Sequence, residues 1–391
     1  MNTYKITCQK LLDRIQKTKC EIVNVLVKYE TFQMANDEIE RSELLLKNID
    51  MQSKFLQEKY AKGISSFLPL NQPFYSLILQ VIVPSLILEK VYYRPPVSQI
   101  ELHKELFNIF VDICNNIELC CVSRNVFFRD YILKSNIVNF TGKYENAISL
   151  KNKLPDDVSM IYNGSAVNPI VIGASAQLDM TVNSVVNARV YNSGQDCMAP
   201  ACIFVEKKIA LTFLSKLERN LKRLKVGANS QKETDIGTLI EQESIMIYRK
   251  MKERYAHNIY LDGAVNEDAK IMEPAIFYFE EVELDMQSIY YAPYFIVMSF
   301  DKLENVHKYL QTDFCELYAG YISLYGVELS RWNWHSGKNS LIVLSETTLC
   351  DVENGNLEFG GYGEGCNFIY HNGQMKVHPI LLLRDIQKLV N

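Results

Sequence analysis

The first 60 residues place apolar side chains at helical spacing, with lysine, glutamate, aspartate and glutamine between them. The apolar positions are Leu11, Leu12, Ile15, Ile22, Val23 and Leu26. Positions three and four residues apart form one face of a helix. We therefore expect two or three surface helices from Tyr4 to about Tyr60, and we interpret the charged side chains of this region as a solvated face.

Beyond this region, apolar runs alternate with helical patterns. The most apolar run, Phe74 to Val91, contains Gln80 and Pro84. These interruptions favour a buried helix and strand over a transmembrane span. Residues 137–143 have the pattern of a strand, a tight glycine turn and a helix start. Alternation of this kind over residues 1–163 predicts a first α/β domain built on a parallel sheet.

The same alternation continues through the middle of the chain. The expected elements are a strand at 170–172, a helix at 178–190, a strand at 203–205 and a helix at 210–224. They predict a second α/β domain over residues 164–345. The last segment, 346–391, has a glycine-rich loop at 359–363 and an apolar run at 380–383 that begins a late strand or a last helix.

Composition is that of an ordinary globular protein. Of 391 residues, 48% are hydrophobic and 22% charged, and the formal net charge is -5. Nothing in this balance indicates nucleic acid or a highly charged partner. The N-terminus leads into an amphipathic pattern with charges throughout and shows no signal-peptide apolar region. The ten cysteines and six histidines lack metal-ligand spacing, so we expect reduced thiols, a cytoplasmic protein and no metal site.

The candidate for chemistry is Cys197, in the motif Gly194-Gln195-Asp196-Cys197 just past the expected helix 178–190. Backbone N–H groups of such a turn favour the thiolate, which is the nucleophilic form of cysteine. A free cysteine is also often a small buried apolar residue. Asn71 lies in a loop bracketed by Pro69 and Pro73. Its amide could donate to an oxyanion or simply close the turn.

Taken in order, several short motifs resemble the aldehyde dehydrogenase superfamily over almost the whole chain. They are Pro-x-Asn-x-Pro at 69–73, Phe-Thr-Gly at 140–142, Asn-Pro at 168–169, Gly-Gln-x-Cys at 194–197, Lys-Val-Gly at 225–227 with Thr-Asp-x-Gly-x-Leu-Ile at 234–240, and Phe-Gly-Gly-Tyr at 359–362. The resemblance implies an α/β fold with two parallel-sheet domains and the active site in the cleft between them. Residues 1–163 would be the dinucleotide-binding-like domain and 164–345 the catalytic domain.

By the same resemblance, Cys197 attacks an aldehyde or acyl carbonyl, Asn71 holds the oxyanion, and hydride passes to NAD or NADP, leaving an acyl thioester on the sulfur. The residues that the resemblance assigns to the cofactor are Arg94, Pro95, Phe140, Thr141, Gly142, Lys143 and Phe359. Lys143 would add a positive charge where a helix begins, a place suited to phosphate.

The departures from the family pattern change the expected chemistry. The acid that serves hydrolytic members as general base falls on Asn163, which cannot take up a proton near neutral pH, and loop glycines have become Ser165 and Ala166. The acid that holds the nicotinamide ribose falls on Ile289. Arg94, with Val97 where many NAD users have an acid, suits a 2′-phosphate and favours NADP.

These departures lead to several hypotheses. The first is an oxidoreductase that interconverts an aldehyde and an acyl thioester, with coenzyme A or a carrier-protein arm in place of water. The alternatives are a cofactor-independent thioester acyltransferase, a non-catalytic binding partner, and a hydrolytic dehydrogenase with another base such as Glu364.

The short segment between Tyr60 and Pro69 lacks the family's association hairpin, so a monomer or an unusual dimer is expected. Trp332 and Trp334 are candidates for a pocket lining or for the core.

Overall fold

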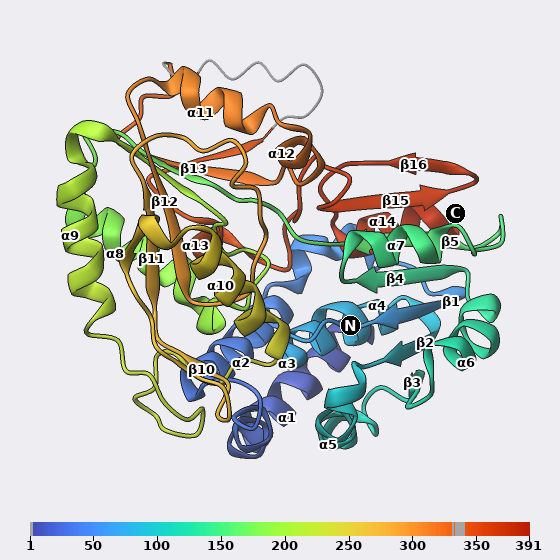
Figure 1. Cartoon of the computed structure of the whole chain (residues 1–391). Coiled ribbons are helices and arrows are strands. Elements are labelled where there is room, and N and C mark those ends of the chain that lie inside the picture. Colours follow the sequence, from blue (N-terminus) through green and yellow to red (C-terminus); the bar gives the residue numbers. More distant parts are fainter. Residues whose placement is uncertain (1–2, 331, 333–340) are drawn as a thin grey trace.

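The structure is a computed structural model that describes residues 3–330, 332 and 341–391. Two largely parallel sheets lie side by side (Figure 1), so the predicted α/β class with two parallel sheets is confirmed. In the described residues the first sheet has the strand order β16 (Gln374–Lys376), β15 (Asn367–His371), β5 (Ser159–Asn163), β4 (Ile137–Thr141), β1 (Tyr60–Phe67), β2 (Leu88–Arg94) and β3 (Ile117–Leu119).

The second sheet has the order β14 (Ile342–Ser345), β13 (Tyr321–Tyr325), β6 (Ile170–Ile172), β7 (Ile203–Glu206), β12 (Tyr294–Phe300), β11 (Ala275–Phe279) and β8 (Ile259–Leu261). Antiparallel pairing occurs where β15 meets β5 and β16, and where β8 meets β11. A separate short ribbon pairs β9 (Val265–Asn266) with β10 (Ile271–Met272).

Helices cover both sheets. Their bounds are α1 (Thr3–Leu26), α2 (Phe32–Lys47), α3 (Pro73–Leu77), α4 (Val83–Ser85), α5 (Ile100–Phe110), α6 (Arg124–Asp130), α7 (Tyr144–Lys151), α8 (Leu178–Val190), α9 (Ala210–Leu221), α10 (Gln242–Arg254), α11 (Leu303–Leu310), α12 (Asp313–Leu317), α13 (Leu349–Val352) and α14 (Leu382–Val390). The expected helices at the N-terminus and at 178–190 and 210–224 are thus present, and the run at 380–383 begins a helix. No described helix has the length and apolar character to cross a membrane.

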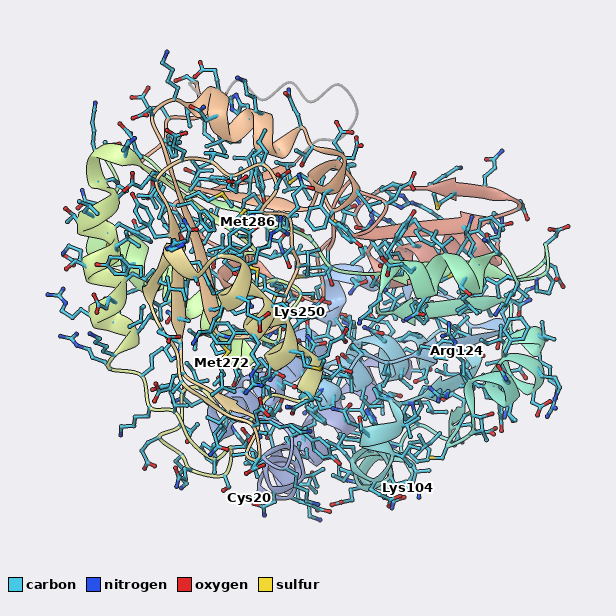
Figure 2. All side chains as sticks on the ribbon, viewed as in Figure 1. Cys20, Lys104, Arg124, Lys250, Met272 and Met286 are labelled. Carbon is cyan, nitrogen blue, oxygen red and sulfur yellow. The ribbon has the colours of Figure 1, made fainter. Side chains whose placement is uncertain are left out.

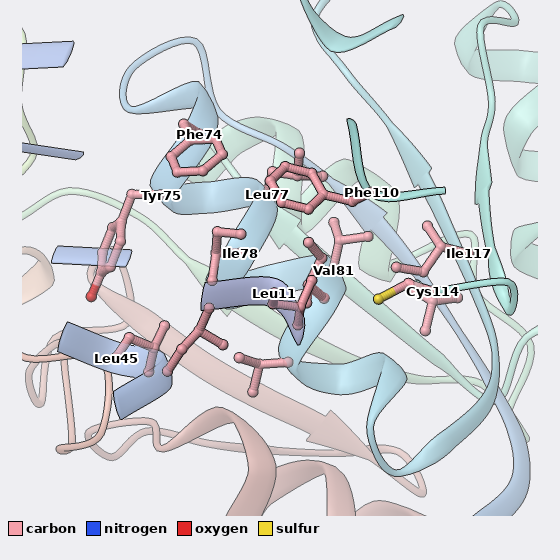
Figure 3. Packing of buried hydrophobic residues seen from close by; sticks show 14 of the residues in the cluster. Leu11, Leu45, Phe74, Tyr75, Leu77, Ile78, Val81, Phe110, Cys114 and Ile117 are labelled. Atoms are coloured by element: carbon pink, nitrogen blue, oxygen red, sulfur yellow. The ribbon is translucent and has the colours of Figure 1, made fainter. Parts of the chain in front are cut away.

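One apolar core joins α1 and α2 to the first sheet through α3 and the π-helical turn Ile78–Ile82. Figure 3 shows side chains of this core converging, with Leu45 of α2, Phe74 and Ile78 on one side and Phe110 of α5 on the other. Burial of such side chains contributes about 1.5–3 kcal/mol each. Packing on this core fixes α2 beside the loop that carries Asn71.

Two acids of the N-terminal region are buried, so the prediction of a wholly solvated charged face was wrong for them. Glu38 is 0% exposed and Glu30 is 3% exposed. The Glu38 Oε2 accepts the backbone N–H groups of Phe74 (2.7 Å) and Tyr75 (2.8 Å) at the start of α3. Amides of a first helical turn have no partner within the helix, which makes them good partners for a carboxylate. Burial raises the pKa of Glu38 to about 7, although these hydrogen bonds act in the opposite direction.

The loop before Cys197 is held by a buried cation, Arg189, near the end of α8. Its guanidinium donates to the carbonyl oxygens of Gly194 (2.6 Å), Pro200 (3.1 Å), Tyr290 (3.1 Å) and Ala292 (2.9 Å). The φ of Gly194 is +77°, and a Cβ there would lie 2.5 Å from the Ala292 backbone. Glycine at 194 therefore lets the two segments approach closely enough for one side chain to bind both.

Arg189→Met should lower the free energy of unfolding by at least about 3 kcal/mol, because each buried carbonyl left without a donor costs about 1–3 kcal/mol. Urea unfolding followed by intrinsic fluorescence measures the change. The matched control is Arg219→Met on α9, where the side chain is exposed and the change should stay within about 0.5 kcal/mol. Equal effects of the two substitutions would contradict this account.

Candidate active site

Two pockets meet at Cys197. The Glu353 pocket has a volume of about 120 Å³, and its polar lining residues include Arg41, Asn71, Gln72, Tyr75, Asn163, Asp196, Cys197 and Glu353. The Arg94 pocket has a volume of about 330 Å³, and its lining includes Arg94, Arg124, Phe140, Thr141, Gly142, Lys143, Ser165, Cys197 and Tyr291. Cys197 and Asn71 line both pockets.

The strand directions explain this convergence. Arg94, Thr141 and Asn163 are the last residues of parallel strands β2, β4 and β5, and ligands of parallel sheets bind at these carboxyl ends. The second sheet supplies Cys197 and Tyr291 from the segments that lead into β7 and β12. The site therefore lies where the carboxyl ends of one sheet face the strand starts of the other.

Cys197 follows α8 and a short 3-10 turn, Tyr191–Gly194. The turn is fixed in part by Gln195, whose Oε1 accepts the Ile240 backbone N–H at 2.6 Å. Desolvation raises the pKa of the Cys197 thiol well above its usual value, and the nearby Asp196 and Glu353 carboxylates add to the rise. Burial and the two acids therefore favour the protonated thiol, which is the opposite of the prediction that backbone N–H groups favour the thiolate.

Asp196 links Cys197 to the Asn71 loop. The Asp196 Oδ2 accepts from the amides of Asn71 (3.3 Å) and Gln72, and Oδ1 accepts the Met198 backbone N–H (2.8 Å). The carboxyl is buried, and burial raises its pKa. One amide hydrogen of Asn71 is used in this contact, so the second remains for another acceptor. Asn71 and Cys197 are thus brought together as predicted.

Asn163 lies in the wall of the Glu353 pocket. Its Nδ2 donates to the Asn139 Oδ1 at 3.1 Å. An amide accepts no proton near neutral pH, so Asn163 offers hydrogen bonds and cannot act as a base. The two lining acids are engaged elsewhere. Asp196 accepts the donors given above, and Glu353 binds Arg41 through Oε2 and accepts the Tyr75 hydroxyl at Oε1 (3.0 Å).

The Arg94 pocket has three cations and one acid, Glu241, in its lining. Arg94, Arg124 and Lys143 bring positive charge to it, and the N-terminus of α7 follows the Phe140-Thr141-Gly142 turn. Burial lowers the pKa of Arg94, and the neighbouring Arg124 lowers it further; two guanidinium groups this close suit an anion that both can bind. Figure 2 shows Arg124 beside the first sheet and the helices that cover it. Lys143 is exposed and pairs with Glu243 at 3.0 Å.

Two of the expected cofactor residues take other positions. Pro95 is buried, whereas Arg94 and Pro96 line the pocket. Side chains alternate along an extended chain, so position 95 points away from the side shared by 94 and 96. Phe359 lines the Glu353 pocket, because its backbone pairs with Ile380. The Ser165 and Tyr291 hydroxyl groups bind each other in the Arg94 pocket, and Tyr291 follows Ile289 by two residues.

Other predicted residues lie apart from the nucleophile. Glu364 is exposed and accepts the Tyr144 hydroxyl at 3.1 Å. Trp332 is buried in a core cluster and packs edge-on against His307, while Trp334 lies outside the described residues. In the described part of the chain, no group of histidine, cysteine, aspartate or glutamate is arranged to hold a metal ion. Each of the ten cysteines is a free thiol.

Sequence reasoning missed several residues of the site. Asp196 stands directly before Cys197, so its contact with the nucleophile could have been found from the motif. Arg41 and Glu353 are 312 positions apart, and no local pattern connects them. Arg124 lies in a segment without a motif of its own, and Tyr291 lies two residues after the predicted Ile289 but was not itself singled out.

Comparisons with known proteins agree with this geometry. Residues 133–314 match the model of the aldehyde dehydrogenase family. A lactaldehyde dehydrogenase of Methanococcus aeolicus is 30% identical over 119 residues, which cover 29% of this chain and 25% of that protein. A betaine aldehyde dehydrogenase of Bacillus subtilis is 29% identical over 130 residues, 33% of this chain and 26% of that protein. The matched segments thus span about a quarter of these relatives.

Solved structures match almost the whole chain. Succinic semialdehyde dehydrogenase from Streptococcus pyogenes, in complex with NADP+, has a TM-score of 0.83 at 14% identity, covering 97% of this chain and 90% of that one. Glyceraldehyde-3-phosphate dehydrogenase GapN from Methanocaldococcus jannaschii, complexed with NADP, has a TM-score of 0.78 at 18% identity, covering 97% and 89%. At these identities the likeness defines the fold.

Alkylation of Cys197 by iodoacetamide should be slow at pH 7 and rise about tenfold per pH unit through pH 9, because only the thiolate reacts and the raised pKa keeps it scarce. Mass spectrometry of the Cys197 peptide follows the rate, with the exposed Cys20 (Figure 2) as the reference. Asp196→Asn removes one negative neighbour and should speed the reaction at pH 7. A rate that reaches its plateau by pH 7 would contradict the raised pKa.

Proposed function

Because this chain belongs to the aldehyde dehydrogenase superfamily, we propose that it is an NAD(P)-dependent oxidoreductase that interconverts an aldehyde and an acyl thioester. The observation that carries the thioester assignment is Asn163. An amide lies in the wall of the pocket that Cys197 opens onto, where a carboxylate would be needed to activate water. The two acids in that wall are held by other donors.

In the proposed reaction the Cys197 sulfur attacks the carbonyl carbon, the S–C bond forms as the C=O π bond breaks, and the thiol proton leaves to solvent. The carbonyl oxygen then carries negative charge. The free amide hydrogen of Asn71 and the Cys197 backbone N–H stabilise it, and one such donor is worth about a hundred- to a thousandfold in rate. Asp196 fixes the orientation of the Asn71 amide, because its Oδ2 accepts a hydrogen bond from the Asn71 nitrogen.

The cofactor is NADP or NAD, with Arg94, Lys143, Phe140, Thr141 and Gly142 as the residues that would hold it. When bound, it accepts or supplies the hydride. The finer proposal is NADP, since Arg94 and Arg124 together could bind a 2′-phosphate. A guanidinium pairs with phosphate through two parallel hydrogen bonds, which a ribose hydroxyl cannot match.

The acyl group is then left on Cys197 as a thioester. Sulfur is a good leaving group, so the acyl group can pass from Cys197 to a second thiol. This transfer needs a weaker general base than transfer to water does. We propose coenzyme A or a carrier-protein arm as that thiol. The chain is proposed to act as a monomer or dimer, because β1 leads directly into the 68–73 loop.

A second candidate is a cofactor-independent thioester acyltransferase. Its basis is the loss of the acid expected at Ile289 and of the loop glycines, which are Ser165 and Ala166 here, with the Ser165 hydroxyl bound to Tyr291 in the Arg94 pocket. Titration of the protein with NADP and NAD separates the two functions. Binding of either dinucleotide at micromolar concentration excludes the acyltransferase.

Asn163→Glu should increase the release of carboxylic acid, measured with aldehyde and NADP+ in the absence of any thiol, by at least about a hundredfold. A general base contributes about a hundred- to ten-thousandfold. Asn163→Gln, which enlarges the side chain without adding a base, is the matched control. Acid release that is already rapid in the unaltered protein, and unchanged in the glutamate variant, would rule out the thioester assignment.

Arg94→Ala should raise the KM for NADPH by about tenfold or more, because a hydrogen bond between charged groups is worth about 1.5–3 kcal/mol. The KM for NADH should change less than threefold. Arg129→Ala on α6, a surface arginine that pairs with Asp130, controls for the loss of one positive charge. The same increase in KM for NADPH and for NADH would show that Arg94 does not bind the 2′-phosphate.

A further inference from the structure

The cation that lines the Glu353 pocket, Arg41, is already occupied by protein groups. Its Nη1 donates to the Tyr191 hydroxyl (2.8 Å) and to the Gln72 Oε1 (3.2 Å), and its Nη2 binds Glu353. The Glu353 side chain is 6% exposed and that of Arg41 is 17% exposed. The guanidinium also lies over the Tyr75 ring, 4.3 Å from its centroid. Arg41 is therefore fixed in place with its charge balanced.

Acids outnumber this cation around the pocket. Asp196 and Glu353 both line it, and Asp37 lies 4.0 Å from Arg41 and accepts the Tyr191 hydroxyl. A carboxylate or phosphate entering the pocket would meet these acids without a free positive charge to bind, and like charges brought together with little water are strongly unfavourable.

The rest of the lining offers apolar contact. The side chains that supply it are Leu79, Met198, Leu357, Phe359, Ile380 and Leu382. They come from the turn after α3, the Cys197 loop and the C-terminal segment, so hydrocarbon surface surrounds the space in front of the nucleophile. Apolar surface removed from water favours binding by about 25 cal/mol per Å², whatever the charge state of Arg41.

We propose that the Glu353 pocket binds uncharged aliphatic acyl groups, and that Glu353 excludes acyl groups with an anionic end by neutralising Arg41. This inference rests on the proposed function of Cys197 as the acyl-accepting nucleophile. It adds the chemical class of the acyl group and identifies Glu353 as a specificity-determining residue.

The test uses addition of an aldehyde to Cys197, which needs neither nucleotide nor second thiol. The S–H group adds across the C=O bond, so an S–C bond forms and the proton moves to the carbonyl oxygen; nothing is oxidised. The adduct protects Cys197 from iodoacetamide, and mass spectrometry of its peptide measures the protection. Pentanal is the uncharged probe and succinic semialdehyde the anionic one.

Pentanal should protect Cys197 at a concentration at least about tenfold lower than succinic semialdehyde does. Glu353→Gln should reduce this ratio by about tenfold, since it removes one acid from the pocket and frees the Arg41 Nη2 that Glu353 binds, and a hydrogen bond between charged groups is worth roughly that factor or more. Any change in the reactivity of Cys197 itself affects both aldehydes equally and cancels in the ratio. Glu358→Gln is the matched control, because Glu358 is exposed and pairs with Arg384; its ratio should stay unchanged.

Equal protection by the two aldehydes, protection by neither, or a ratio unaltered in Glu353→Gln would each overturn the proposal. Failure of the proposed oxidoreductase function has a different signature. In that case aldehyde protection keeps its selectivity for pentanal, while incubation with nucleotide and coenzyme A yields no hydride transfer.

Discussion

The hydrogen bonds of Asp196 connect the two halves of the site. This carboxyl lies beside the nucleophile, just before β7 of the second sheet, and binds the amides of Asn71 and Gln72, which follow β1 of the first sheet. Removing a carboxylate from water costs several kcal/mol unless donors replace the water. The two amides and the Met198 backbone N–H do so. The relative position of Cys197 and Asn71 therefore depends on one buried acid.

Asp196 also affects the reactivity of Cys197. Its negative charge, together with that of Glu353, raises the pKa of the Cys197 thiol beyond the effect of desolvation alone. The site thus holds Cys197 and Asn71 in a fixed arrangement, and at the same time it keeps the Cys197 thiol protonated before a substrate binds. A scarce thiolate slows reaction of Cys197 with any electrophile.

Much of the architecture could be predicted from the sequence, because strands and helices follow from local periodicity. The helix Leu178–Val190 and the strand Ile170–Ile172 lie where the pattern put them. Cys197, Asn71 and Asn163 were found because each sits in a short motif, and they line one pocket. Their catalytic roles remain predictions, as do the domain boundaries. Strands β15 and β16, from the last segment of the chain, join the sheet formed by residues 60–163.

What the sequence did not reveal depends on contacts between distant segments. Glu38 was taken for a surface charge because its neighbours are polar, yet it binds the start of α3 at zero exposure. The Arg41–Glu353 pair crosses the whole chain, and neither residue belongs to a motif. Pro95 and Phe359 were assigned by motif membership alone, whereas the direction of the backbone at each position decides which pocket its side chain faces.

The central claim is that Cys197 holds an acyl group that water does not readily remove. Intact-protein mass spectrometry after incubation with a short aliphatic aldehyde and NADP+, without added thiol, tests it directly. The account predicts one acyl mass on the protein, mapped to Cys197 and absent from Cys197→Ser, which persists until coenzyme A is added. An unmodified protein mass together with stoichiometric carboxylic acid and NADPH would contradict it.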